Sequence, residues 1–241
     1  MTTPVRPPGS ALHAVLLDID GTLIASNDAH ARSWVAAFSA HGYDVPFQRV
    51  RPLIGKGGDK LVPELTGLDA DSGEVERIGE SRGTIFREQE LPMLRATPGA
   101  RDLLVRLRDA GLLLVVATSA QADEVGAILE QAGVSDLIEF ASSSDDAERS
   151  KPDPDIIRAA LRKSGSLATQ SVMIGDTPYD IEAAARAGVP TIALRCGGWW
   201  DDAALAGAVE IHDDPAGLLQ GIRNSALGRV VGSFSERLSA K

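Results

Sequence analysis

LLDIDGTLIAS, residues 16–26, ends an apolar run with two acidic side chains, Asp18 and Asp20. Side chains alternate in direction along an extended chain, so these two carboxylates are predicted to lie on the same side. Two close carboxylates repel each other, and such a pair needs either a raised pKa or a nearby cation. Gly21 permits a tight turn directly afterwards. The stretch therefore predicts a buried strand, from about residue 11, that ends at a chemically active edge.

Four further apolar runs lack the polar alternation of a half-exposed strand, which is typical of a parallel sheet buried on both faces. They lie at residues 112–120, 137–144, 171–176 and 190–195. Between and around them stand segments with helical spacing that end in glycine, a common helix stop, at residues 100–111, 121–133, 152–165 and 178–188. This alternation predicts an α/β fold with a doubly wound parallel sheet. Ligands of such sheets bind beyond the carboxyl ends of the strands, where Asp18, Thr118 and Asp176 fall.

Residues 27–96 interrupt this rhythm with helical stretches and no strong apolar strand. An insertion after the first strand is predicted to lie over the carboxyl edge of the sheet and to act as a lid. We therefore expect a core domain made of residues 11–26 and 97–223 and a helical cap of residues 27–96. Residues 1–10 and 224–241 are expected to be flexible or weakly structured.

The charge balance restricts the partners of the chain. Its 241 residues carry 34 Asp and Glu against 24 Lys and Arg, a formal charge of −10, which disfavours nucleic acid and anionic membrane surfaces. The single cysteine, Cys196, fits a reducing compartment. No apolar run is long enough to cross a membrane, and the first residues lack the apolar core of a signal peptide. We therefore expect a cytoplasmic protein.

Four separated motifs carry a family resemblance. They are DIDGTL at 18–23, VVATS at 115–119, SKPDP at 150–154 and GDTPYD at 175–180. In this order, each at a predicted strand end or helix start, they resemble the haloacid dehalogenase (HAD) superfamily. The resemblance implies a Rossmann-like core and a Mg2+-dependent phosphotransferase that acts through an aspartyl phosphate. The helical insertion resembles the subclass of phosphoglycolate phosphatase-like and β-phosphoglucomutase-like enzymes.

The resemblance also implies roles for individual residues. Asp18 would be the nucleophile, Asp20 the general acid and base, and Lys151 the cation that pairs with the nucleophile. Thr118 would bind the phosphoryl group. Gly21, Thr22 and Ser119 are further candidates for binding substrate or phosphate, although Thr118 and Ser119 also fit the cap of the following helix.

Mg2+ is the cofactor that the resemblance implies. Asp18, the backbone carbonyl of Asp20 and Asp176 would coordinate the ion, and Asp180 would support the site. Asp176 and Asp180 also fit plain acidic residues at a helix N-terminus. The sequence has no cysteine and histidine cluster that would suggest zinc or iron.

The predicted cap contributes candidates for substrate selection. His30 matches a position where mutase-like members carry a histidine that couples cap closure to catalysis. Lys56 and Lys60 are candidates for contacting an anionic substrate group. The arginine that mutase-like members place in this loop is replaced here by Gly58, which weakens the mutase interpretation. Trp199 and Trp200 are interpreted as packing residues.

These observations favour a phosphatase that acts on a small phosphorylated metabolite. The alternatives are a β-phosphoglucomutase-like phosphomutase and a non-catalytic binding protein on the same fold. Haloacid dehalogenation is less favoured, because dehalogenases generally lack the second aspartate of the first motif. The sequence does not fix the oligomeric state.

Overall fold

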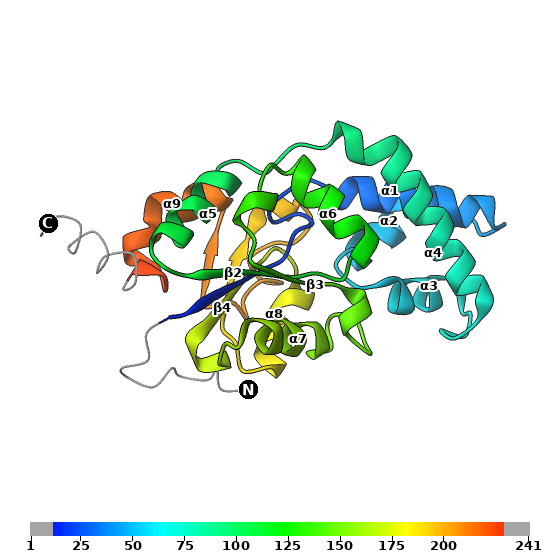
Figure 1. Ribbon diagram of the computed structural model, residues 1–241. Coiled ribbons are helices and arrows are strands. Elements are labelled where there is room, and N and C mark those ends of the chain that lie inside the picture. Colours follow the sequence, from blue (N-terminus) through cyan, green and yellow to red (C-terminus); the bar gives the residue numbers. More distant parts are fainter. Residues whose placement is uncertain (1–11, 229–241) are drawn as a thin grey trace, which may run out of the picture.

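A six-stranded parallel sheet forms the centre of the protein in the computed structural model, which describes residues 12–228 (Figure 1). The strand order is β3-β2-β1-β4-β5-β6. The strands are β1 (Ala14–Leu17), β2 (Leu113–Ala117), β3 (Phe140–Ser142), β4 (Ser171–Gly175), β5 (Thr191–Leu194) and β6 (Glu210–His212). The predicted doubly wound α/β sheet is thus confirmed. The segment 1–10 and the residues beyond 228, for which flexible ends are predicted, lie outside the described residues.

Strand β6 is the one element of the sheet that the sequence analysis missed. It has 3 residues, all of them only partly buried, and pairs with β5 at the edge of the sheet. A run this short and polar carries no apolar signal. The other five strands, β1 to β5, each fall within one of the five predicted apolar runs, and each strand is shorter than its run.

Helices cover both faces of the sheet. One face packs against α5 (Ala100–Asp109), α6 (Ala122–Gln131) and α9 (Pro215–Gly221), whose apolar residues join one large core cluster. The other face packs against α7 (Asp155–Ser164) and α8 (Pro178–Arg186). Figure 1 shows these helices on opposite sides of the strands. Burial on both faces explains why the strands show no polar alternation.

A second group of helices lies between β1 and β2 in the sequence and beside the sheet in space (Figure 1). It contains α1 (Asn27–Ala40), α2 (Phe47–Val50), α3 (Gly58–Thr66) and α4 (Gly73–Ile85), and a π-helical segment, Phe86–Glu90, continues α4. Residues from 31 to 78, among them Trp34, Phe38 and Leu61, form a hydrophobic cluster of their own. These helices therefore bury their apolar faces mainly against one another.

The parallel register brings the carboxyl ends of the central strands to one edge. Leu17 of β1 pairs with Val116 of β2 and with Ile174 of β4. The segments that follow these strands carry Asp18, Thr118 and Asp176, as the sequence analysis predicted. None of the helices between residues 12 and 228 has the length and apolar character needed to span a membrane.

Candidate active site

The first motif and Lys151 meet at this edge. Asp18 directly follows β1, and its Oδ1 lies 2.5 Å from Nζ of Lys151. Lys151 is 1% exposed, and its Nζ also donates to Oδ1 of Asp180 at 2.7 Å. A lysine this deeply buried needs anionic partners, because taking an ammonium ion out of water is costly. The two carboxylates supply them, so the structure brings three predicted residues from three distant motifs into direct contact.

Asp176, after β4, is held in place by two donors. Thr22 Oγ1 donates to its Oδ1 at 3.0 Å, and Asn27 Nδ2 donates to its Oδ2 at 2.8 Å. Gly21 has a φ of +79°, and a Cβ there would overlap both Asn27 and the Asp176 carboxylate. Only glycine fits this position, because the backbone conformation and the close approach both exclude a side chain.

Asp180 caps the N-terminus of α8 and also contacts Lys151 in the site. Its Oδ2 accepts hydrogen bonds from the backbone N–H of Thr177 at 3.0 Å and from Thr177 Oγ1 at 2.7 Å, which completes a capping box at the start of α8. Its other oxygen accepts from Lys151. The two interpretations of Asp180, as a helix acid and as a site residue, are therefore compatible.

Burial controls the electrostatics of this cluster. Burial raises the pKa of the Asp18 carboxyl well above its ordinary value; Lys151 opposes the rise, and Asp180 adds to it. Burial and the neighbouring Asp180 carboxylate raise the pKa of Asp176 to about 7. For Lys151, burial lowers the pKa, but Asp18 and Asp180 outweigh burial and raise it above its ordinary value. One ammonium ion therefore does not balance the three carboxylates.

This excess of negative charge fits a bound cation. Among the described residues, Asp18, Asp176 and Asp180 each place a carboxylate oxygen within 4.8 Å of the others, and all three are buried. The donors are oxygen atoms only, the type that hard divalent ions such as Mg2+ prefer. The chemistry of the cluster thus agrees with the metal site that the sequence predicted.

Asp20 points to a different set of partners. Its Oδ1 lies 2.8 Å from Nε2 of His30 and accepts a hydrogen bond from Ser26 Oγ at 2.5 Å. Burial raises the pKa of Asp20, but His30 and Ser26 outweigh burial and leave the pKa below its ordinary value. The His30 ring stacks on Phe86 with centroids 4.0 Å apart. His30 is thus fixed as a direct partner of Asp20.

A small cavity of about 60 Å³ lies between these residues and the loop that follows α2. Asp18, Asp20, His30, Lys56, Thr118 and Ser119 are among the residues that line it. Thr118 Oγ1 accepts from the backbone N–H of Ala120 at 3.1 Å, and Ser119 Oγ donates to the carbonyl of Gly55 at 3.3 Å. Neither side chain caps α6, whose N-cap residue is Gln121. Thr118 and Ser119 therefore line the cavity beside Asp18 without capping α6.

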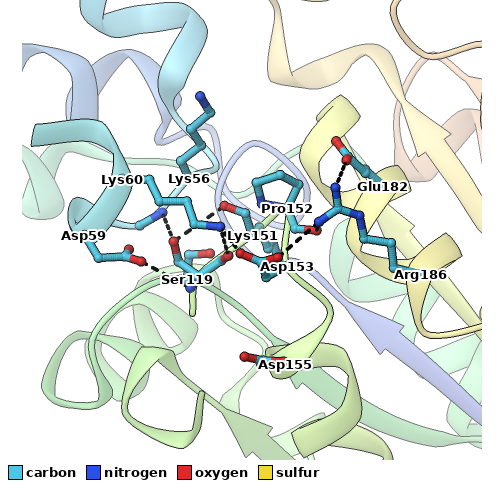
Figure 2. Close-up of polar contacts among 12 residues, drawn as sticks. Lys56, Asp59, Lys60, Ser119, Lys151, Pro152, Asp153, Asp155, Glu182 and Arg186 are labelled. Atoms are coloured by element: carbon cyan, nitrogen blue, oxygen red, sulfur yellow. Dashed lines mark hydrogen bonds and ion pairs between the residues drawn. The ribbon is translucent and has the colours of Figure 1, made fainter. Parts of the chain in front are cut away.

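The two lysines of the predicted substrate loop differ. Lys56 lines the cavity and pairs with Glu64 at 2.5 Å. Lys60 instead bonds to Asp153 (Figure 2) and to the carbonyl of Ser150. The structure does not place Lys60 on the cavity; it joins α3 to the loop that carries Lys151. Thr22 and Gly21 are also absent from the cavity wall; Thr22 donates a hydrogen bond to Asp176, and Gly21 leaves room for the Asp176 carboxylate.

Four polar residues at the site were missed by the sequence analysis, and one of them is Ser26, the hydrogen-bond donor to Asp20. Asn27 contacts Asp176, and buried Arg82 of α4 donates from Nη1 to both oxygens of buried Glu124 in α6, at 3.0 and 2.9 Å. Arg82 and Glu124 both line the cavity. They are far apart in the sequence, and no local pattern pairs them. Trp200 packs edge-on against Tyr179, as predicted for a packing residue, whereas Trp199 is exposed beneath Arg51.

The fold and this cluster define a class of enzyme. Residues 15–194 match the family model described as haloacid dehalogenase-like hydrolase. The chain belongs to this family, which confirms the resemblance seen in its motifs.

Particular relatives refine this assignment. The chain is 32% identical over 211 residues to the N-acetylmuramic acid 6-phosphate phosphatase of Pseudomonas aeruginosa, covering 86% of this chain and 93% of that protein. It is 31% identical over 216 residues to the phosphoglycolate phosphatase of Rhodospirillum rubrum, covering 85% of this chain and 88% of that protein. A hydrolase from Pseudomonas syringae superposes with a TM-score of 0.82 at 27% identity, covering 89% of this chain and 99% of that one. Family and relatives together identify the chain as a phosphatase.

Proposed function

We propose that the protein is a Mg2+-dependent phosphatase that hydrolyses a small organic phosphomonoester through an aspartyl phosphate on Asp18. The observation that carries the proposal is the buried contact between Asp18 and Lys151 beside a cavity that also holds Asp20. A carboxylate that attacks an anionic phosphoryl group needs a fixed cation next to it, and Lys151 supplies one.

In the first half-reaction, a carboxylate oxygen of Asp18 attacks phosphorus and the bond from phosphorus to the leaving oxygen breaks. Lys151 stays protonated, since its pKa lies above the ordinary value, and it offsets negative charge on Asp18 and on the transferred group. Thr118, which lines the cavity, donates a hydrogen bond from its hydroxyl to a phosphoryl oxygen. The Ser119 hydroxyl donates to the carbonyl of Gly55 while the cap is closed. Asp20 gives a proton to the leaving oxygen. Because its pKa is low, this step draws on the small fraction of the protein in which Asp20 is protonated.

In the second half-reaction, the Asp20 carboxylate takes a proton from water, and this water attacks phosphorus. The bond between Asp18 and phosphorus then breaks, which releases phosphate and restores the Asp18 carboxylate. Ser26 and His30 hold Asp20 at the cavity throughout both steps. Because His30 keeps the pKa of Asp20 low, its carboxylate form is available as the base.

Asp18, Asp176 and the backbone carbonyl of Asp20 are the proposed Mg2+ ligands, with Asp180 in support. When bound, the ion balances the excess negative charge of the cluster and orients a phosphoryl oxygen. Asn27 and Thr22 fix the Asp176 carboxylate for this purpose.

Residues 27–96 are proposed to act as a cap over a core made of the remaining described residues. Several polar contacts join the two parts next to the site: Ser119 to Gly55, Lys60 to Asp153, and Arg82 to Glu124. Figure 2 shows the contacts around Lys60. A cap held by such contacts excludes water during the first half-reaction, and it opens when they break.

A panel of phosphomonoesters tests the proposed function. Purified protein with Mg2+ should release inorganic phosphate from at least one member, and chelation of the metal should stop the release. Interconversion of sugar phosphates that requires a bisphosphate, without net release of phosphate, would show a phosphomutase instead. Binding of phosphate esters without any turnover would show a non-catalytic protein.

Mg2+ binding should depend on pH, because Asp176 has its pKa raised to about 7. A carboxyl whose pKa is higher in the folded state holds its proton more tightly there, so the metal-free protein should lose stability as pH rises from about 4 to about 7. Mg2+ must displace this proton below pH 7. The rise in melting temperature at a fixed Mg2+ concentration should therefore be larger at pH 8 than at pH 6. Asp176→Asn should remove most of the rise at both pH values, and an equal rise for the wild type at both would contradict the assignment.

A further inference from the structure

A cleft of about 510 Å³ adjoins the cavity at Asp18. One wall comes from α3, α4 and the loop between them, and the other comes from the loops that follow β2 and β3. The cleft and the cavity share the lining residues Trp34, Gly57, Gly58, Arg82 and Ser119. A phosphomonoester whose phosphoryl group is bound at Asp18 therefore extends its leaving group into this cleft, which has the volume typical of a small-molecule site.

The walls of the cleft are strongly acidic. Their charged residues are Asp59, Asp71, Glu76, Glu80 and Glu148, with Arg82 as the one Lys or Arg among the lining residues. Within residues 12–228, the side chains of Asp71, Glu76, Glu80 and Glu148 have neither an ion pair nor a hydrogen bond to another side chain. Four carboxylates around one cleft produce a negative potential that repels an anionic group and attracts a cationic one.

Arg82 does not offset this charge. It is 7% exposed, and its Nη1 is bound by the carboxylate of Glu124, so the pair as a whole is neutral. Its buried Nε has no hydrogen-bond partner, and neither has the buried hydroxyl oxygen of Ser72 on the same cleft. A buried donor without a partner is costly, and an oxygen atom from a ligand would satisfy it. The cleft thus offers polar groups suited to hydroxyl or carbonyl oxygens.

The two lysines of the predicted substrate loop do not line the cleft. Lys60 is paired with Asp153, and Lys56 is paired with Glu64. A second phosphate or a carboxylate on the leaving group would therefore meet four carboxylates and no free lysine among the lining residues.

We propose that this cleft selects phosphomonoesters with a polyhydroxylated leaving group of about hexose size that is neutral or, best, cationic, and that it disfavours leaving groups with a carboxylate or a second phosphate. The hydroxyls bond to Arg82, Ser72 and the carboxylates, while an ammonium group is held by Asp71, Glu76 and Glu80. This inference rests on the proposed phosphatase function, and it adds the class of substrate.

Three hexose-derived phosphates have leaving groups of different charge: glucosamine 6-phosphate, glucose 6-phosphate and 6-phosphogluconate. Because 6-phosphogluconate is open-chain, sorbitol 6-phosphate is measured beside it as the neutral open-chain control. Each is measured at pH 7 as a substrate, by kcat/KM, and as a competitor of p-nitrophenyl phosphate hydrolysis, by its inhibition constant. The cationic compound should be favoured over the carboxylate by at least about tenfold, with the neutral compound between them. Raising the salt concentration should narrow this ratio, because salt screens exposed charges.

A charge-matched pair of triple variants assigns the effect to the cleft. Asp71→Asn combined with Glu76→Gln and Glu80→Gln should reduce the ratio to about threefold or less. The control, Glu88→Gln combined with Asp102→Asn and Glu130→Gln, removes the same three charges at exposed positions that do not line the cleft, and it should keep the wild-type ratio. All six residues are exposed, so both proteins should fold, which circular dichroism checks.

The outcomes separate the inference from the proposed function. Equal values for the three compounds, a preference for 6-phosphogluconate, or an unchanged ratio in the cleft variant overturns the inference while phosphate release still supports the phosphatase. Absence of phosphate release from every ester overturns the proposed function. In that case the ranking of the three compounds as ligands, measured by calorimetry, still decides whether the cleft selects for charge.

Discussion

Asp18→Asn should abolish phosphate release, with a loss in kcat of at least about 10³-fold. An amide oxygen is a far weaker nucleophile than a carboxylate, and Asp18 is the carboxylate that touches both Lys151 and the cavity. The measurement is the rate of phosphate release with the best ester of the panel at saturating Mg2+.

The loss should not come from unfolding. Burial raises the pKa of Asp18, which means that its ionised form is disfavoured in the metal-free fold, and an amide of the same shape removes that penalty. Lys151 keeps its contact with Asp180. We therefore expect a melting temperature equal to or above that of the wild type at pH 8. Asp44→Asn, at an exposed position, serves as the matched control and should retain full activity. Equal rates for Asp18→Asn and the wild type would remove Asp18 from the reaction.

The sheet and the centre of the site could be predicted from the sequence because each depends on a local signal. The buried strands are apolar without alternation, and a turn with Gly21 follows the first of them. Asp18, Lys151 and Asp176 each stand at the end of an apolar run or before a helix. Parallel pairing then brings these positions to one edge, so their convergence follows from the topology.

The rest of the site depends on contacts between side chains that no local pattern records. Arg82 and Glu124 meet across 42 residues, and Lys60 meets Asp153 across 93. Lys60 has the sequence context of a substrate-binding lysine, yet its ammonium group lies on a core carboxylate because α3 packs against the loop of Lys151. Asn27 stands next to the first motif, but its role becomes visible only when Asp176 is placed beside it.

The acidic cleft could not be predicted from a local sequence pattern either. A negative net charge predicts that the molecule as a whole repels polyanions, but it does not show where on the surface the charges lie. Asp71 lies in the loop before α4, and Glu76 and Glu80 lie in α4; in the sequence all three resemble ordinary solvent-exposed charged residues. The structure places these three residues on the cleft that adjoins the cavity at Asp18, so their charges act on a group bound there.

Lys151→Met should be the most destabilising of the single substitutions considered, by about 3–5 kcal/mol. Lys151 is 1% exposed, and its removal leaves the Asp18 and Asp180 carboxylates buried without their cation. Lys163→Met is the matched control. Lys163 also pairs with an aspartate, Asp146, but its side chain is 42% exposed, so its loss should cost about 1 kcal/mol or less. Urea unfolding of both variants at pH 7 gives the comparison.

The cost of Lys151→Met should also depend on pH in a definite direction. Lys151 is the cation that lowers the pKa of Asp18, so without it the pKa of this buried carboxyl rises further. The folded variant then holds a proton that its unfolded chain has released, and its stability falls as pH rises from 5 to 8. The difference in unfolding free energy between the wild type and the variant should therefore widen over this range, and Mg2+ should narrow it again at pH 8 by replacing the lost positive charge. A difference below 1 kcal/mol that stays constant from pH 5 to pH 8 would mean that Lys151 does not balance the acidic cluster, and the charge argument for phosphoryl transfer at Asp18 would fail with it.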